Sequence, residues 1–301
     1  MAEAVSVEAP AKINLRLCVL GRETSGFHAL ETLFCAISLA DRITLREGDR
    51  GIQLDVDGNE VLGAPEQNLV VRAAERFYRE IGRTAHLQVQ LHKRIPAAAG
   101  LGGGSSDAAA TLRALNVLHA DILPPHRLLE MGSELGSDVP FFLCGSSLAL
   151  AWGRGERLLT LPPLPARPVL IAHPGIAMPT PAAFRRLADS RGKSYRAPAS
   201  ALELEALARW GGVAAVAIND FDPFARAEIP GLATAVVAMQ THGAEIAMLS
   251  GSGAAVFGVF GDARARDAAA ATVGPLGFST RAAETLTVMP VSRVDRAAPV
   301  G

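Results

Sequence analysis

The chain has 301 residues, more than one ordinary hydrophobic core requires, and this length favours two domains. Hydrophobic residues make up 49% of the sequence, which is enough to bury a substantial core without disulfides or metals. The 29 Lys and Arg residues nearly balance the 30 Asp and Glu residues, and the formal net charge of −1 argues against a protein that binds nucleic acid or a membrane surface.

Neither a membrane span nor a secretory signal is expected. The longest stretch without charged residues runs from Pro168 to Phe184 and is interrupted by prolines, so it cannot cross a bilayer as a regular helix. The N-terminus has no basic region followed by an apolar one. The cysteines Cys18, Cys35 and Cys144 lie far apart in apolar runs, which predicts reduced core residues and no metal site. We therefore expect a soluble, cytoplasmic protein.

The first ninety residues are mainly predicted to be strands, because short apolar runs and polar–apolar alternation with period two dominate them. Such runs occupy residues 12–19, 33–39, 43–46, 52–56 and 86–92. We expect Ala40 and Asp41 to separate the second strand from the third. Before the last strand, apolar residues recur every fourth position from Leu69 to Ile81, which predicts an amphipathic helix that ends at Gly82.

The rest of the chain alternates helices and strands around a glycine-rich loop. The predicted elements are a helix with Ala108, Leu112 and Leu115 on one face, a helix over 125–135, a strand over 169–172, a helix over 232–241, a strand pair around 250–253, a helix from 263 and a last strand over 286–288. Prolines crowd residues 158–168 and mark a domain boundary. We predict the α+β class, with domains over 1–162 and 163–301.

The glycine-rich loop is the most informative segment. It comprises Pro96, Ala97, Ala98, Ala99, Gly100, Leu101, Gly102, Gly103, Gly104, Ser105 and Ser106. Its glycines allow the backbone N–H groups to approach a ligand, and the following helix adds the positive end of its dipole, so the segment predicts an anion site. We expect Ser105 or Ser106 to cap that helix and Gly103 to have a positive φ. The alternative interpretation is a flexible linker. The spacing fits neither a Walker A loop nor a dinucleotide fingerprint.

The loop resembles the second motif of the GHMP kinase superfamily, in which it wraps the phosphates of ATP. Further segments resemble motifs of one branch, the 4-diphosphocytidyl-2-C-methyl-D-erythritol kinases. These are residues 9–15, Ser25-Gly26-Phe27-His28, Gly136-Ser137-Asp138-Val139-Pro140, residues 179–184 and residues 250–253. The resemblance implies a two-domain GHMP-kinase-like architecture, with a ribosomal-protein-S5-domain-2-like N-terminal domain and a ferredoxin-like C-terminal domain. It also implies ATP-dependent phosphorylation of the 2-hydroxyl of 4-diphosphocytidyl-2-C-methyl-D-erythritol in the non-mevalonate isoprenoid pathway.

The catalytic residues implied by the resemblance are Lys12 and Asp138. Asp138 would accept the proton of the attacking hydroxyl or orient that hydroxyl. Lys12 would face Asp138 and stabilise charge near the attacking oxygen. Only three of the 29 basic residues are lysines, namely Lys12, Lys93 and Lys193, so a compact ammonium is kept at few positions. We also expect an extended backbone after Asp138, because Val139 precedes a proline.

The binding residues carried over from the family fall into two groups. The nucleotide group adds Lys93, Asn68 and Leu69 to the loop, although Asn68 can equally be a helix N-cap. The substrate group comprises Asn14, Phe27, His28, Phe184, Ser252 and Gly253. Phe27 and Phe184 would hold a cytosine between them, with Phe27 standing where the family usually has Tyr. The implied substrate is thus a small molecule that carries a cytidine diphosphate group.

Mg²⁺ is expected to arrive with ATP and to touch Ser105 or Ser106, and no dedicated protein ligand for a metal is identified. We expect no nucleic-acid or membrane partner, and a monomer or weak homodimer. Two alternatives stay open: another GHMP kinase that acts on homoserine or mevalonate, and a non-catalytic nucleotide- or RNA-binding module of the same fold.

Overall fold

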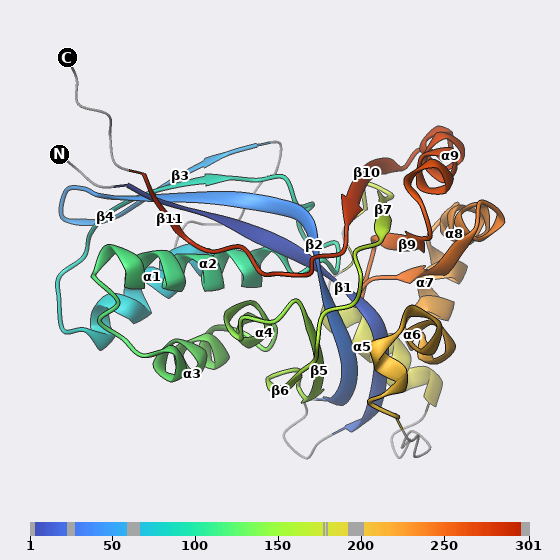
Figure 1. The fold of residues 1–301 in the computed structure, drawn as a ribbon, viewed down its shortest axis with the longest axis horizontal. Helices are drawn as coiled ribbons and strands as arrows, with labels where there is room; N and C mark the ends of the chain where they lie inside the picture. The colour runs from blue at the N-terminus through green and yellow to red at the C-terminus, as the bar shows by residue number, and fades with distance from the viewer. Residues whose placement is uncertain are drawn as a thin grey trace.

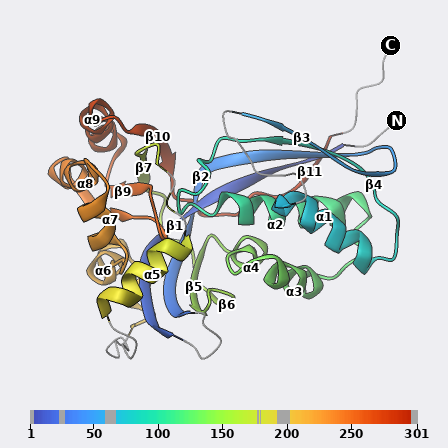
Figure 2. The same ribbon diagram turned by 180° about the vertical axis from the view of Figure 1, so that it is seen from behind.

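The computed structural model describes residues 4–22, 28–58, 67–176, 178, 180–191 and 202–295. In this part of the chain, two β-sheets form, one of seven strands and one of four, and helices pack against each sheet (Figures 1 and 2). Mixed helices and strands confirm the predicted α+β class. Among the described residues, no helix is long and apolar enough to cross a membrane.

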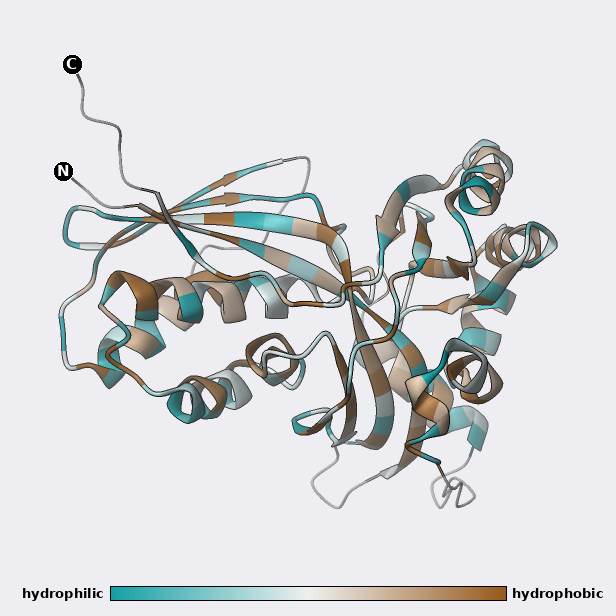
Figure 3. Cartoon of the chain, in the orientation of Figure 1, coloured by the Kyte–Doolittle hydropathy of each residue, from teal (hydrophilic) through white to brown (hydrophobic). Residues whose placement is uncertain are grey.

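The first sheet is built around two long antiparallel strands. Its strands are β1 (Ala4–Arg22), β2 (His28–Glu47), β3 (Gly51–Asp57), β4 (His86–His92), β5 (Leu148–Gly153), β6 (Arg157–Thr160) and β11 (Arg293–Asp295). Their order is β11-β1-β2-β4-β3, while β5 pairs with β2 and β6 pairs with β5. Figure 3 shows hydrophilic and hydrophobic colours changing along β1 and β2. Over residues 12–19 the polar and the apolar positions are both buried, so the alternation there does not separate an exposed face from a buried one.

The expectation of two strands at 33–39 and 43–46 is wrong, because both belong to β2. Ala40 and Asp41 continue the pairing with β1, opposite Pro10 and Ala9. Asp41 is fully buried inside the strand, and its carboxylate accepts hydrogen bonds from the backbone N–H groups of residues 94 and 95. A carboxylate that ordinarily ends a strand is tolerated here because distant backbone groups satisfy it.

Four helices lie on one side of the first sheet (Figure 1). They are α1 (Leu69–Glu80), α2 (Gly103–Leu118), α3 (Pro125–Leu135) and α4 (Val139–Leu143), with α3 packed against the other three rather than against the strands. The predicted apolar face of α1 is confirmed, since Ala73 and Phe77 are fully buried in the core shared with α2 and the sheet. Complete burial of a large apolar side chain such as Phe77 contributes about 1.5–3 kcal/mol.

The second sheet has the strand order β10-β7-β9-β8. Its strands are β7 (Pro168–His173), β8 (Ala244–Leu249), β9 (Val256–Phe260) and β10 (Ser279–Glu284), and its helices are α5 (Thr180–Arg191), α6 (Trp210–Val216), α7 (Asp222–Glu228), α8 (Leu232–Thr241) and α9 (Ala263–Val273), with short 3₁₀ turns at Ala206–Ala208 and Gly274–Leu276. The strand expected at 286–288 is wrong: β10 ends at Glu284, where its pairing with β7 ends, and the last strand is β11 in the first sheet.

The two halves of the molecule share one hydrophobic cluster. Ile13 of β1 and Leu33 of β2 belong to the same buried group as Trp210 and Phe257 from the second half. Strand β11, near the end of the described chain, returns to pair with β1. The division at residues 162 and 163 falls in the connection between β6 and β7, and it stays a prediction, as do the two named domain folds.

Candidate active site

Nearly every predicted site residue that the structure describes lines one cleft of about 1700 Å³. The predicted residues that line it are Lys12, Asn14, His28, Asn68, Leu69, Lys93, Pro96, Ala97, Ala98, Ala99, Gly100, Leu101, Gly102, Gly103, Gly104, Ser105, Asp138, Phe184 and Ser252. Ser106 and Gly253 are not part of its lining, and Phe27 lies outside the described residues. Segments far apart in sequence therefore meet around one cavity.

The glycine-rich loop reaches α2 through a left-handed residue. Gly102 is the N-cap of α2, with φ 72°, and a Cβ placed there would lie only 3.0 Å from Cγ of Lys12. The expected serine caps are wrong, because Gly103 already begins the helix and Ser105 and Ser106 lie inside its first turn. Gly103 itself has no positive φ. Because a glycine has no Cβ, the loop can lie close to the strand that carries Lys12.

Lys12 is a buried cation with its donors directed into the site. Its side chain belongs to β1 and the residue is 3% exposed. The ammonium Nζ donates to Oδ1 of Asn14 at 2.6 Å and to the carbonyl oxygen of Gly100 at 2.9 Å. Burial lowers the pKa of Lys12, and the facing carboxylate of Asp138 opposes that shift. The charged form is therefore maintained by a few specific acceptors.

Asp138 stands directly before α4, and its Oδ2 lies 3.7 Å from Nζ of Lys12. The backbone of Asp138 is helical, with φ −88° and ψ −14°, and its side chain does not cap α4. The expected extended backbone after it is wrong, because Val139 begins the helix and Pro140 occupies the first turn, where a missing N–H costs nothing. The carboxylate makes no capping hydrogen bond, and the side chain, which is 29% exposed, lines the cleft.

Lys93 is held by two carboxylates that sequence reasoning missed. Its ammonium bonds to Asp41 and, at 2.8 Å, to Oδ2 of Asp107 in the first turns of α2. Burial lowers the pKa of Lys93, but the two carboxylates outweigh burial and raise it. Burial raises the pKa of Asp107 to about 7, against the attraction of Lys93. Asp107 directly follows the glycine-rich loop but the sequence assigns it no role there, and Asp41 stands in no motif, so only the fold reveals the cluster.

At the other side of the loop, Asn68 is the N-cap of α1. Its Oδ1 accepts a hydrogen bond of 2.9 Å from the backbone N–H of Val70. Leu69, the first residue of α1, lies next to the loop, since a Cβ at Gly104 would be 3.6 Å from its Cδ1. The capping interpretation of Asn68 is confirmed, and any contact with a nucleotide stays a prediction.

The far end of the cleft is aromatic. His28 stacks on Phe184 of α5, with ring centroids 4.7 Å apart, and Phe184 meets the edge of Phe221 at 4.9 Å. The hydroxyls of Thr180 and Ser252 lie 2.9 Å apart, which joins the start of α5 to the loop after β8. Phe184 is therefore both a wall of the cleft and part of a partly buried aromatic cluster.

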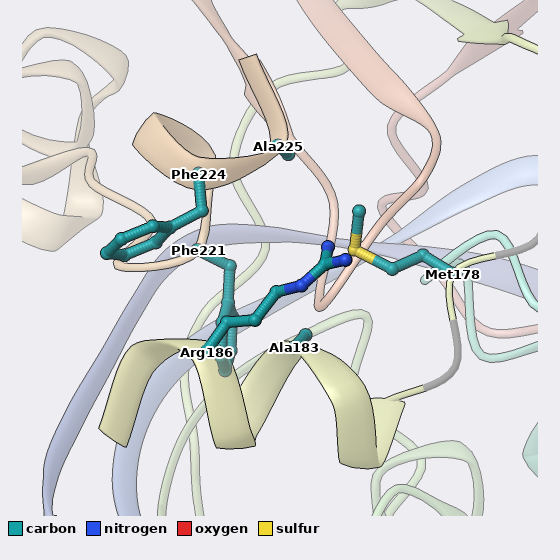
Figure 4. A pocket seen from close by; sticks show the side chains of 6 residues that line it. All are labelled: Met178, Ala183, Arg186, Phe221, Phe224 and Ala225. Carbon is teal, nitrogen blue, oxygen red and sulfur yellow. The ribbon is translucent and has the colours of Figure 1, made fainter. Parts of the chain in front are cut away.

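Phe221 also lines a second cavity, of about 10 Å³, together with Met178, Ala183, Arg186, Phe224 and Ala225 (Figure 4). This space has room for about one water molecule and cannot hold a substrate. No group of three or more His, Cys, Asp or Glu side chains suited to a metal ion occurs among the described residues. The large cleft is thus the candidate active site.

Comparisons with known proteins agree with this geometry. A family model described as GHMP kinases N terminal domain matches residues 68–146, the segment from the cap of α1 to the loop between α4 and β5. The 4-diphosphocytidyl-2-C-methyl-D-erythritol kinase of Moorella thermoacetica is 41% identical over 263 residues, which cover 86% of this chain and 91% of that protein. The protein of the same name from Deinococcus radiodurans is 39% identical over 88% of this chain and 87% of its own.

Solved structures show the same relationship. A crystal structure of 4-(cytidine 5'-diphospho)-2C-methyl-D-erythritol kinase superposes with a TM-score of 0.78 and 34% identity, covering 93% of this chain and 98% of that one. The homoserine kinase of Cytophaga hutchinsonii superposes with a TM-score of 0.68 at 19% identity, over 98% of this chain and 97% of that one. The second match shows a shared fold.

Proposed function

Because the chain belongs to the 4-diphosphocytidyl-2-C-methyl-D-erythritol kinase family, we propose that its cleft transfers the γ-phosphoryl group of ATP to the 2-hydroxyl of that cytidine substrate. The observation that carries the proposal is the distance of 3.7 Å between Nζ of Lys12 and Oδ2 of Asp138, beside a glycine-rich helix N-terminus in one cleft. The carboxylate of Asp138 could accept the proton of a hydroxyl, and the ammonium of Lys12 supplies a positive charge. Both lie beside a backbone suited to binding phosphate groups.

In the proposed reaction, the substrate hydroxyl oxygen forms a bond to the γ-phosphorus of ATP while the bond from that phosphorus to the bridging oxygen breaks. ADP leaves with the electron pair of that bond. The carboxylate of Asp138 orients the hydroxyl and accepts its proton, directly or late in the transfer. The ammonium of Lys12 stabilises the negative charge that spreads over the transferring group. The product is the 2-phosphate of the substrate.

The nucleotide is proposed to lie along the loop of residues 96–106. The backbone N–H groups at the start of the 16-residue helix α2 would bind its phosphates, and the helix dipole favours their negative charge. Asn68, Leu69 and Lys93 line the same part of the cleft and are proposed to border the nucleoside. The ammonium of Lys93 is engaged by two carboxylates, so its contribution is to shape the pocket.

The donors around the loop fit a Mg²⁺ ion that arrives with ATP. Ser105 lines the cleft and would be the residue whose hydroxyl touches the ion, whereas Ser106 is not part of the lining and its hydroxyl is buried without a hydrogen-bond partner. Hydroxyl oxygens suit a hard cation that keeps most of its waters and phosphate ligands. When bound, Mg²⁺ supplies neutralisation of charge on the phosphates.

The substrate is proposed to occupy the aromatic end of the cleft. Phe184 and His28 would contact the cytosine there together with Phe27, and Asn14 would lie near the erythritol part. Ser252 lines the cleft and would border the substrate from the loop between β8 and β9, where Gly253 follows it. We further propose a cytoplasmic enzyme, monomeric or weakly dimeric, without a nucleic-acid partner. Free cysteines and the balanced charge support this proposal.

Release of ADP tests the function. We expect turnover with ATP, Mg²⁺ and 4-diphosphocytidyl-2-C-methyl-D-erythritol, and a new phosphomonoester signal by ³¹P NMR. Homoserine and mevalonate serve as control substrates and are expected to give background rates. Turnover of either control at a higher rate would assign the chain to another GHMP kinase class. Binding of ATP without any turnover would favour the non-catalytic alternative.

A further inference from the structure

The buried hydroxyl of Thr32 lies behind the catalytic lysine, in the neighbouring strand. Thr32 belongs to β2, is fully buried and lines the cleft beside Asn14. Its Oγ1 donates to the backbone carbonyl of Arg16 at 2.6 Å and accepts from Nδ2 of Asn14 at 2.7 Å. The resemblance to the family assigns no role to Thr32, and nothing in the local sequence marks it.

The hydrogen atoms of this group can be assigned without ambiguity. A carbonyl oxygen only accepts, so the single hydroxyl hydrogen of Thr32 is committed to Arg16. Its oxygen must then accept, and Asn14 must present its NH₂ group to Thr32. An ammonium only donates, so Lys12 independently requires the Asn14 oxygen on its own side. The two requirements agree, and they fix one orientation of the amide.

The backbone of β1 is irregular at the same place. Its pairing with β2 shifts register between Asn14 and Arg16, so Leu15 has no directly opposite residue. Such a bulge redirects side chains and is frequent next to active sites. The bond from Thr32 to the Arg16 carbonyl therefore holds the bulge and the amide together.

We propose that Thr32 is a positioning residue for phosphoryl transfer: its hydroxyl holds the Asn14 amide with the oxygen toward Lys12, and the amide in turn holds the ammonium between Gly100 and Asp138. The inference rests on the proposed function for its kinetic consequence. The proposed effect of Thr32 on the Asn14 amide does not depend on turnover, because the amide oxygen bonds directly to the Lys12 ammonium.

The groups that face the Lys12 ammonium can be named element by element. Asp138 faces it from the start of α4, and the carbonyl of Gly100 accepts from it in the loop. Asn14 accepts from it within β1, and the ring of Phe34 in β2 lies 5.4 Å from Nζ. Asp138 is the charged partner in this set. Loss of the Asn14 oxygen therefore removes one of few acceptors that offset burial.

Thr32→Val tests the proposal, since valine keeps the shape and removes the hydroxyl. We expect kcat to fall about ten- to a hundredfold, because a displaced ammonium weakens transition-state stabilisation, with KM for ATP within about threefold. Thr32→Ser restores the hydroxyl and should restore kcat. In an Asn14→Ala background, Thr32→Val should have no further effect, because Thr32 acts through Asn14.

A second measurement does not need turnover. With ¹⁵N-labelled lysine the chain gives only three side-chain signals, and Lys12→Met identifies that of Lys12. In Thr32→Val the pKa of Lys12 should fall by about one unit further, while Lys93 titrates unchanged. If the wild type shows no kinase activity, the proposed function fails, and this titration still decides the role of Thr32.

Thr285→Val is the matched control. Thr285 is also buried, and its hydroxyl accepts from the backbone N–H of Arg167 at 2.9 Å, outside the cleft. We expect it to lose stability with kcat and the Lys12 titration unchanged. An unaltered Lys12 titration and kcat in Thr32→Val, or a serine variant as impaired as the valine variant, would overturn the proposal. If the valine variant does not fold, Thr32→Ala is measured in the same way.

Discussion

Nζ of Lys12 lies 3.7 Å from Oδ2 of Asp138, although one residue belongs to the first strand and the other precedes α4. The side chain of Lys12 is 4% exposed and that of Asp138 is 29% exposed, so the cation is buried and the carboxylate is open to the cleft. Attraction to the carboxylate of Asp138 favours the charged form of Lys12. A hydroxyl that enters the cleft meets a carboxylate whose position is set by the fold.

Asp138→Asn should abolish most turnover while the site stays formed. The amide keeps the size of the side chain and cannot accept a proton as the carboxylate does, so kcat should fall by roughly 10²–10⁴. ATP affinity, measured by calorimetry, should stay close to that of the wild type. Turnover within a few-fold of the wild type would remove Asp138 from the mechanism.

Lys12→Arg should impair catalysis although the charge is kept. The guanidinium is larger and planar, and the space around Nζ is filled, since a Cβ at Gly251 would lie 3.2 Å from it. We expect kcat to fall by at least about tenfold. Steady-state kinetics with a thermal melt measures this loss separately from stability. An arginine variant with full activity would show that positive charge alone suffices.

Gly102→Ala should weaken ATP binding by at least about tenfold, because φ is +72° and the new Cβ would lie 3.0 Å from Lys12 and 3.1 Å from Phe142. The loop must then move away from the position that presents its N–H groups. Gly82→Ala is the control, since Gly82 has φ +65° and open space around a Cβ. Calorimetric titration should show normal ATP affinity for the control, and equal affinity in both variants would contradict the phosphate-loop assignment.

The sequence predicts well those helices and strands whose positions follow from the local spacing of apolar residues. Strands β3 and β4 and helices α1 and α3 lie where alternation or four-residue spacing places them. Two predictions fail because distant groups decide the outcome. Asp41 continues β2 because residues 93–95 satisfy its carboxylate, and β10 is positioned by pairing with β7. The local pattern of apolar and polar residues carries no information on either of these distant contacts.

The site shows the same division. Motif resemblance identified Lys12, Asp138 and the loop, because those residues stand in recognisable strings. Thr32, Asp41 and Asp107 were missed, since each is defined by a hydrogen bond to a side chain on another element of the fold. Backbone conformation at Val139 and Gly103 was also mispredicted, because helix starts tolerate Pro in the first turn and need no serine cap.

The buried cluster around Lys93 should make stability depend on pH. Burial raises the pKa of Asp107 to about 7 from 3.8, so the folded state takes up a proton that the unfolded state does not hold in this range. This contribution is present below pH 3.8 and is lost as the pH rises to about 7. The free energy of unfolding of the wild type should therefore decrease over this window relative to that of Asp107→Asn.

Urea unfolding at several pH values checks this prediction. Asp267→Asn is the control, because Asp267 is exposed at α9 and should leave the pH dependence of the wild type intact. A difference between wild type and Asp107→Asn that is constant with pH would show that Asp107 is ionised in the folded state throughout.

The last prediction concerns Phe184, which the cleft and the aromatic cluster share. If its ring contacts the cytosine, Phe184→Ala should cost about 1–3 kcal/mol of substrate binding, the range for stacking of a base on an aromatic ring. This equals a roughly 5- to 150-fold rise in the dissociation constant. ATP affinity should hardly change, because the nucleotide phosphates are assigned to the loop before α2. Calorimetry with each ligand separates the two effects.

Phe224→Ala decides whether such a loss reflects stacking or a loosened core. Phe224 packs against the same hydrophobic cluster as Phe184 but lines only the small cavity of Figure 4 and not the cleft. Both variants should lose stability, and Phe184→Ala alone should lose substrate affinity. The ring of Phe184 stacks on that of His28 and both substitutions remove this contact. Phe184→Leu keeps apolar volume without a ring face, so it should bind substrate as weakly as the alanine variant. Normal affinity in the leucine variant would mean that Phe184 supports the wall of the cleft without stacking on a base.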